Sequence, residues 1–154
     1  MRRAGLFALG LVALAGCRNH DLAFRGDDGL RIVRPGDRQR VTLPVTLQWK
    51  GSASLYAVFV DRSPMPAGKD LEWLARGDDV CRRSPTCPDR AWFNAHGVFV
   101  SETESVTIPA ISSSSGRRAR SDGGHRFVVV PLVNGGRRNT ESASARTLIV
   151  GKDG

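Results

Sequence analysis

Three cysteines are the side chains of this sequence best suited to covalent chemistry, and they stand at positions 17, 81 and 87. Cys81 and Cys87 enclose the short segment 82–86, which Pro85 stiffens. A zinc site would require paired Cys-x-x-Cys spacing or a histidine cluster nearby, and the sequence has neither. In an exported chain, where thiols become oxidised, this spacing predicts a disulfide between Cys81 and Cys87.

The remaining cysteine, Cys17, follows a segment with the layout of a secretory signal. Arg2 and Arg3 give a positive start, an apolar run covers 4–15, and small residues precede the cysteine. The apolar run is too short to span a bilayer, and polar residues begin at Arg18. The sequence therefore predicts export, with residues 1–16 removed as a signal peptide.

The four residues Leu14-Ala15-Gly16-Cys17 resemble the lipobox of bacterial lipoproteins and match it at every position. The resemblance implies that the Cys17 thiol receives a diacylglyceryl group, that cleavage occurs just before it, and that the new amino terminus is acylated. Two or three acyl chains would anchor the protein stably, whereas one chain would be marginal. The alternative is an ordinary cleaved signal without lipid. The expected location is a bacterial envelope membrane, on its extracytoplasmic side, with the leaflet left open.

Residues 17–28 are charged and aperiodic, which predicts a flexible tether, and 29–151 is long enough for one domain. The net charge of +8 falls to +6 once Arg2 and Arg3 leave with the signal. Outside the cytoplasm, a basic surface is expected to meet anionic lipid, an anionic envelope polymer or an acidic envelope protein rather than nucleic acid. The oligomeric state is left open.

Alternating apolar and polar residues predict several short strands separated by turns. The clearest is 41–50, whose alternate residues from Val41 to Trp49 are apolar, with Pro44 marking an edge or a bulge because it lacks an N–H. The runs 55–60 and 127–133 are apolar on both faces and should be central. Further strands are predicted at 29–34, 98–100, 104–111 and 145–150.

Residues 61–97 interrupt this strand pattern. Helical spacing occurs at 69–76 and 89–96, and a glycine, Gly77 or Gly97, follows each segment as a helix end often requires. With the cysteine pair between them, these segments predict a short, disulfide-stapled helical insertion beside the sheet. Its aromatic residues would form either a small core of their own or a lid on the sheet, and they are Trp73, Trp92 and Phe93.

The strand sequences 45–49, 55–60 and 127–136, followed by Ser142-Ala143-Ser144, resemble fibronectin type III and related immunoglobulin-like domains. The resemblance implies an all-β fold, an antiparallel sandwich over 29–151 with 61–97 inserted, and Trp49 as the tryptophan of the second strand. The chain departs from the family where a tyrosine usually precedes the sixth strand, because Arg126 or Phe127 stands there.

No other residues form a motif for metal or acid–base chemistry. The histidines at 20, 96 and 125 match no nucleophile, ligand or acid–base pattern, and capping or surface roles are expected for His96 and His125. Asp27-Asp28 and Asp78-Asp79 lie beside glycines in predicted turns, without the spaced ligands of a calcium site. Arg-Gly-Asp occurs at 25–27 and 76–78 and is attributed to composition. We expect no cofactor, no metal and no catalytic residue.

The loop 112–124 is rich in serine, glycine and arginine, and it has almost nothing to bury. Its arginines either keep a linker solvated or bind an anionic envelope component, since loops on a rigid scaffold often carry function. They are Arg117, Arg118 and Arg120. The sequence favours a lipid-anchored, non-catalytic binding or accessory module. The alternative is a small envelope hydrolase or metal-dependent enzyme with a site under the 61–97 insertion.

Overall fold

The structure is a computed structural model, and it describes residues 29–111, 123–133, 135–138 and 142–151. Cys17, the tether and the arginines at 117, 118 and 120 lie outside the described residues. Within the described ranges, no helix is long and apolar enough to cross a membrane.

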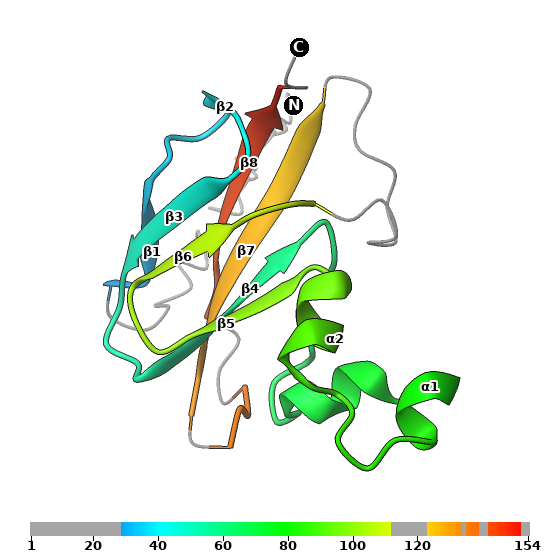
Figure 1. The fold of residues 1–154 in the computed structure, drawn as a ribbon. Helices are drawn as coiled ribbons and strands as arrows, with labels where there is room; N and C mark the ends of the chain where they lie inside the picture. The colour runs from blue at the N-terminus through cyan, green and yellow to red at the C-terminus, as the bar shows by residue number, and fades with distance from the viewer. Residues whose placement is uncertain (1–28, 112–122, 134, 139–141, 152–154) are drawn as a thin grey trace, which may run out of the picture.

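Strands dominate the described residues and form two sheets (Figure 1). The three-stranded sheet has the order β1-β3-β6, with β1 at Arg31–Arg34, β3 at Val45–Lys50 and β6 at Ser105–Ile108. The five-stranded sheet has the order β2-β8-β7-β4-β5, with β2 at Arg40–Val41, β8 at Ser144–Val150, β7 at Gly124–Leu132, β4 at Leu55–Val60 and β5 at Val98–Ser101. Neighbouring strands are antiparallel except β2 and β8. The predicted β class, with a few short helices, is confirmed.

The main hydrophobic core lies between the two sheets. From β3 it receives Val45, Leu47 and Trp49, which alternate with exposed residues as the sequence pattern predicts. The five-stranded sheet contributes inward residues of β4, β5, β7 and β8, namely Tyr56, Val58, Val60, Phe99, Phe127, Val129 and Leu148. The Trp49 and Tyr56 rings meet edge to face with their centroids 5.3 Å apart. The core is therefore built from side chains of both sheets, and the contact between Trp49 and Tyr56 joins β3 to β4.

The strand predicted at 41–50 is in fact two strands in different sheets. Residues Arg40–Val41 pair with β8, whereas Val45–Lys50 pairs with β1 and β6. The chain crosses between the sheets at Leu43 and Pro44, because proline cannot donate to a ladder and restricts the residue before it. The prediction of a single continuous strand was wrong, although Val41 and Leu43 still pack against the core as expected.

The two strands predicted to be central have neighbours on both sides. β4 lies between β7 and β5, and β7 lies between β8 and β4. Both faces of each are covered, because a second hydrophobic core lies on the outer side of the five-stranded sheet. This second core contains Ala57 and Phe59 of β4, Val128, Val130 and Leu132 of β7, and also Met65 and Val98.

The 61–97 insertion covers that outer face between β4 and β5 (Figure 1). Leu71, Trp73, Leu74 and Phe93 pack on the second core, so the aromatic residues Trp73 and Phe93 form a lid on the sheet rather than a separate core. The segment predicted at 69–76 is a 3-10 helix, η2, at Leu71–Ala75, and 89–96 contains α2 at Arg90–Ala95. A further helix, α1 at Asp79–Arg82, was not predicted.

The turn after β7 fastens the insertion to the sheet. The N–H of Gly68 donates to the carbonyl of Arg138 at 2.6 Å, and the N–H of Arg138 donates to the carbonyl of Lys69 at 2.8 Å. The Arg138 side chain is 6 % exposed, and its Nη1 donates to the Met65 carbonyl at 2.7 Å. Buried charged groups need such hydrogen bonds, so Arg138 holds the start of the insertion in place.

Candidate functional site

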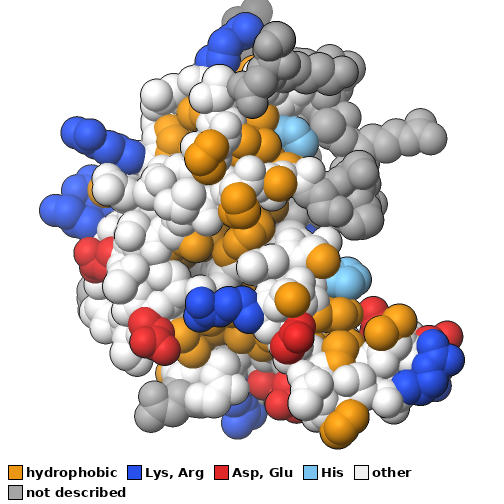
Figure 2. All heavy atoms as spheres, viewed as in Figure 1, with side chains coloured by type: hydrophobic (Ala, Val, Ile, Leu, Met, Phe, Trp, Pro, Cys, Tyr) orange, Lys and Arg blue, Asp and Glu red, His pale blue; other side chains and the backbone are white. Residues whose placement is uncertain are grey.

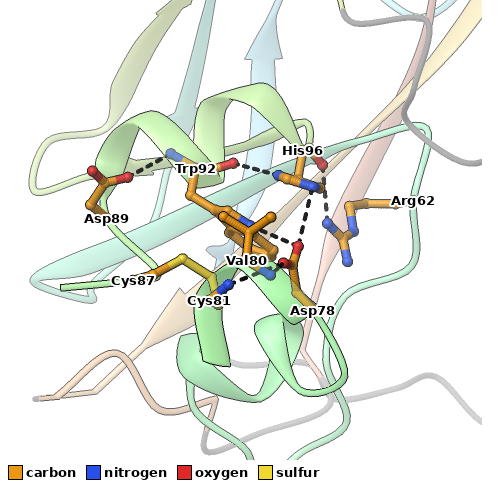
Figure 3. A network of polar contacts seen from close by, with 8 residues as sticks. All are labelled: Arg62, Asp78, Val80, Cys81, Cys87, Asp89, Trp92 and His96. Atoms are coloured by element: carbon orange, nitrogen blue, oxygen red, sulfur yellow. Dashed lines mark hydrogen bonds and ion pairs between the residues drawn. A yellow bond between two sulfur atoms is a disulfide. The ribbon is translucent and has the colours of Figure 1, made fainter. Parts of the chain in front are cut away.

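The insertion contains a polar network centred on the Asp78 carboxylate (Figure 3). Oδ1 accepts from the N–H groups of Val80 at 2.8 Å and Cys81 at 3.1 Å, which makes Asp78 the N-cap of α1. Oδ2 accepts from Nε1 of Trp92 at 3.0 Å, and Nε2 of His96 lies 3.9 Å away. Asp78 therefore ties α1 to α2.

These contacts favour the ionised form of Asp78. The N–H of Cys81 and the Trp92 indole lower the pKa of Asp78 below its ordinary value, and the N–H of Val80 acts in the same direction. The carboxylate is already engaged by backbone and indole donors. The Arg-Gly-Asp triplet at 76–78 therefore does not present a free carboxylate, and its Asp78 has a structural role.

Trp92 and His96 extend the network along α2. Their rings stack with centroids 4.0 Å apart and an interplanar angle of 21°, and His96 Nδ1 lies 2.7 Å from the Trp92 carbonyl. His96 is the C-cap residue of α2, the capping role expected for it. The carbonyl of His96 accepts from Nη1 of Arg62 at 3.1 Å, and burial lowers the pKa of that guanidinium. Trp92 therefore belongs to this network and not to the second core.

The disulfide expected from the sequence is present between Cys81 and Cys87, whose Cα atoms are 4.8 Å apart. Cys81 is buried at the centre of α1, and Cys87 precedes α2 by three residues. The covalent link and the Asp78–Trp92 hydrogen bond therefore hold the same two helices together. The neighbouring Asp79 carboxylate pairs with Arg82 on α1.

A second polar pair joins the end of β4 to the start of β7. His125 Nδ1 lies 2.5 Å from Asp61 Oδ2, and Asp61 Oδ1 accepts from the N–H of Arg126 at 2.8 Å. Asp61 has φ of 54°, in the left-handed region that few residues other than glycine adopt. Its N–H donates to the Arg126 carbonyl at 2.8 Å, which extends the ladder between β4 and β7.

Sequence reasoning missed the Asp61–His125 pair, whose members are 64 residues apart. The available signal was positional: Asp61 directly follows the predicted strand 55–60, and His125 shortly precedes 127–133. These ends meet only if the two strands are antiparallel neighbours, and the strand lengths alone did not establish that pairing.

The pKa of Asp78 leads to a prediction about acid stability. Asp78→Asn should lower the free energy of unfolding at neutral pH, because the carboxylate charge favours the folded state. A group whose pKa is lowered by folding stabilises the protein above its unfolded pKa of about 3.9 and loses that effect as pH falls through the folded value. The difference between variant and parent should therefore shrink below about pH 4.

Urea unfolding monitored by fluorescence, at neutral pH and across the acid range, measures this difference. Glu102→Gln is the charge-matched control, because Glu102 is exposed and makes no hydrogen bond in the described part of the chain. Its unfolding should follow that of the parent at neutral pH. A difference between Asp78→Asn and the parent that stays constant into acid would contradict the charge-based account.

Within the described ranges, no group of three His, Cys, Asp or Glu side chains is arranged to hold a metal ion. The structure brings together Asp78 with His96 and Asp61 with His125, and it joins the predicted cysteine pair. The other predicted site residues, Cys17 and the loop arginines, lie outside what it describes. In comparisons with known proteins, no family model, no curated protein and no solved structure matches this chain.

Proposed function

We propose that this chain is a bacterial lipoprotein in which Cys17 carries the lipid anchor and the domain is a non-catalytic binding module. The observation that carries the proposal is the complete Leu14-Ala15-Gly16-Cys17 sequence at the end of a segment built like an export signal. The Cys81–Cys87 disulfide supports export, because such bonds persist in oxidising compartments outside the cytoplasm.

We further propose that the domain is immunoglobulin-like, of fibronectin type III kind. In that architecture, strands A, B and E share one sheet and strands C, F and G the other. Taking β1, β3 and β6 as A, B and E, and β4, β7 and β8 as C, F and G, gives the same division. Trp49 then lies on the second strand, as is usual in fibronectin type III domains. The insertion would lie directly after strand C.

The insertion supports a binding role for the domain. It is held by the disulfide, by the Asp78 network and by the contacts of Arg138, and rigid scaffolds commonly carry function on their connecting segments. Val80 on α1 is 64 % exposed, which offers an apolar contact next to the disulfide. An envelope protein or an anionic envelope polymer is the proposed class of partner.

Membrane fractionation tests the anchoring part of this proposal. The full chain should remain with bacterial membranes through a high-salt wash and should be extracted only by detergent, because acyl chains are held by burial in the bilayer and not by charge. Release by salt alone would identify a peripheral protein and contradict the proposal.

The segment predicted as a loop at 112–124, whose last residue Gly124 begins β7 in the structure, gives a separate prediction. Replacing Arg117, Arg118 and Arg120 with serine should weaken co-sedimentation with isolated envelope at low salt, because contacts with an anionic component would be electrostatic and screened by salt. Unfolding in urea should not change. Equal binding by the triple variant and the parent would exclude this role for the loop and favour a solvated linker.

A second candidate function is a small envelope hydrolase, and the Asp61–His125 contact is the observation that favours it. When a carboxylate accepts a hydrogen bond from Nδ1–H of a histidine, Nε2 is the nitrogen that can accept a proton, as in acid–base catalysis. The pair lies where β4 meets the insertion. Ester or amide hydrolysis by the parent but not by a folded His125→Gln variant would support this candidate over the binding module.

A further inference from the structure

Residues 29–50, at the start of the domain, carry a net positive charge. Residues 29–50 contain five basic residues and one acidic residue, whereas the insertion 61–97 contains six of each. All five basic residues are exposed, namely Arg31, Arg34, Arg38, Arg40 and Lys50. The acidic residue, Asp37, uses Oδ1 to accept from the N–H of Thr147 at 2.9 Å. Figure 2 shows Lys and Arg side chains projecting from the side where β1 and β3 lie in Figure 1.

Two of these charges face each other across a strand pair. Arg31 of β1 is directly opposite Lys50 of β3, and both side chains are exposed. Directly opposite residues have Cβ atoms about 4.5–5.5 Å apart, and like charges at this separation destabilise a sheet. Within the described part of the chain, neither side chain forms an ion pair. Folding therefore gains nothing from this pair of charges.

Arg34 adds a third charge to the same exposed face. It is opposite Gln48 on β3, and it forms no ion pair with a described residue. Glu104 lies at the Lys50 end of this sheet, where its Oε1 accepts from the N–H of Gly51 at 3.0 Å. One acidic residue beside three basic ones leaves a net positive surface on the edge strand β1 and the adjoining end of β3. We call Arg31, Arg34 and Lys50 the basic edge.

The basic edge also begins a short way after the proposed anchor, because β1 is the first strand of the described residues. Arg31 follows Cys17 by 14 residues, a stretch that can reach at most about 50 Å when fully extended. A lipid on Cys17 would therefore keep the edge close to a bilayer surface at a high effective concentration. Under that condition, even a weak electrostatic attraction is enough to orient the domain.

We propose that the basic edge docks on the anionic lipid headgroups of the membrane that holds the anchor, an inference that rests on the proposed lipidation for its geometry. The partner follows from charge complementarity and from the short chain between Cys17 and β1. In Figure 1, the insertion with α1 and α2 lies on the other side of the domain from β1 and β3. Docking at the basic edge thus leaves the insertion facing away from the membrane, where a partner can reach it.

Vesicle co-sedimentation with the lipid-free mature chain, residues 17–154 carrying Cys17→Ser, tests the docking surface separately from the anchor. One set of vesicles contains phosphatidylglycerol with phosphatidylethanolamine, and the other contains phosphatidylcholine alone. The edge variant is Arg31→Gln, Arg34→Gln and Lys50→Gln. The insertion variant removes the same charge from exposed positions elsewhere, by Arg76→Gln, Arg83→Gln and Arg90→Gln.

The parent should bind the anionic vesicles at low salt and should not bind the neutral ones. Each basic residue near an anionic surface strengthens binding about fivefold, so the edge variant should bind about 100-fold more weakly. The insertion variant should bind like the parent. Unfolding in urea should occur at the same or a higher denaturant concentration in the edge variant, since the Arg31–Lys50 repulsion is removed.

The proposal would be overturned by equal losses in the two variants, by no binding of the parent to anionic vesicles, or by equal binding of the parent to both vesicle types. The first would show that net charge acts rather than this edge. Binding to isolated envelope polymer without binding to vesicles would assign the edge to a different partner and also overturn it. Because the chain in this assay carries no lipid, these failures leave the proposed modification of Cys17 untouched.

Discussion

Trp49→Ala is expected to lower the free energy of unfolding by about 3–5 kcal/mol, as large-to-small substitutions in cores do. Trp49 is 2 % exposed, and it packs between the two sheets with its ring against that of Tyr56. Removing the indole leaves a cavity in the main core, which the surrounding strands can fill only in part. This would be a large part of the stability of an ordinary domain, and most of that of a marginal one, since domains are stable by only about 5–15 kcal/mol.

Urea unfolding of the lipid-free mature chain, followed by circular dichroism, measures the effect. Thr46→Ala is the matched control, because Thr46 lies on the exposed face of the same strand and its hydroxyl contacts that of Thr107 at 2.8 Å. It should cost about 1 kcal/mol or less. If Trp49→Ala lowered the free energy of unfolding by less than about 1 kcal/mol, the face of β3 that carries Trp49 would not be packed in the core.

The facing of β3 and the central places of β4 and β7 could be predicted from the sequence alone. A period of two reports directly which face of a strand is buried, and an apolar run reports burial on both faces. Val45, Leu47 and Trp49 are buried for the first reason. The second applies to the strands at Leu55–Val60 and Gly124–Leu132, each of which contacts both cores.

The crossing at Pro44 could not be predicted from the pattern. The apolar alternation continues from Val41 through Trp49 because both strand pieces face the same core, so the pattern gives no sign that the chain changes sheets. Proline marked the irregular position, but an edge, a bulge and a crossing all satisfy its missing N–H. The pairing partners of the two pieces decide between them, and these are far away in the sequence.

In the candidate site too, features with a local sequence signal could be predicted, and contacts between packed elements could not. The disulfide could be predicted because it depends on local spacing and on the compartment. The four-residue helix α1 was too short to show a hydrophobic period, although Asp78 gave its N-cap. The bond from Trp92 to Asp78 depends on how α1 and α2 pack, which no local pattern specifies.

Cys17→Ser is expected to abolish lipid modification and with it the retention of the chain in membranes. The thiolate is the nucleophile in cysteine chemistry, and a serine hydroxyl at the same position is far less reactive without a neighbouring base. Without acyl chains, the variant lacks roughly 0.8 kcal/mol for every methylene group that would have been buried in the bilayer. The double variant Cys81→Ser, Cys87→Ser is the control, and it should keep its lipid.

Membrane retention of the Cys17→Ser variant after a high-salt wash would contradict this expectation, since no other residue of the predicted cleavage region carries a thiol. Loss of lipid in the control variant would show that folding of the domain, and not the residue at position 17, governs modification. The pair of variants therefore separates the anchor from the disulfide.

Mass spectrometry of the amino-terminal peptide of the membrane-extracted protein tests directly whether Cys17 is cleaved free and lipidated. We expect a peptide that begins at Cys17 and carries a diacylglyceryl group on its sulfur, with a further acyl group on its amino terminus in the fully processed form. A peptide with an unmodified Cys17, or one that still contains residues 1–16, would contradict the assignment of this chain as a lipoprotein.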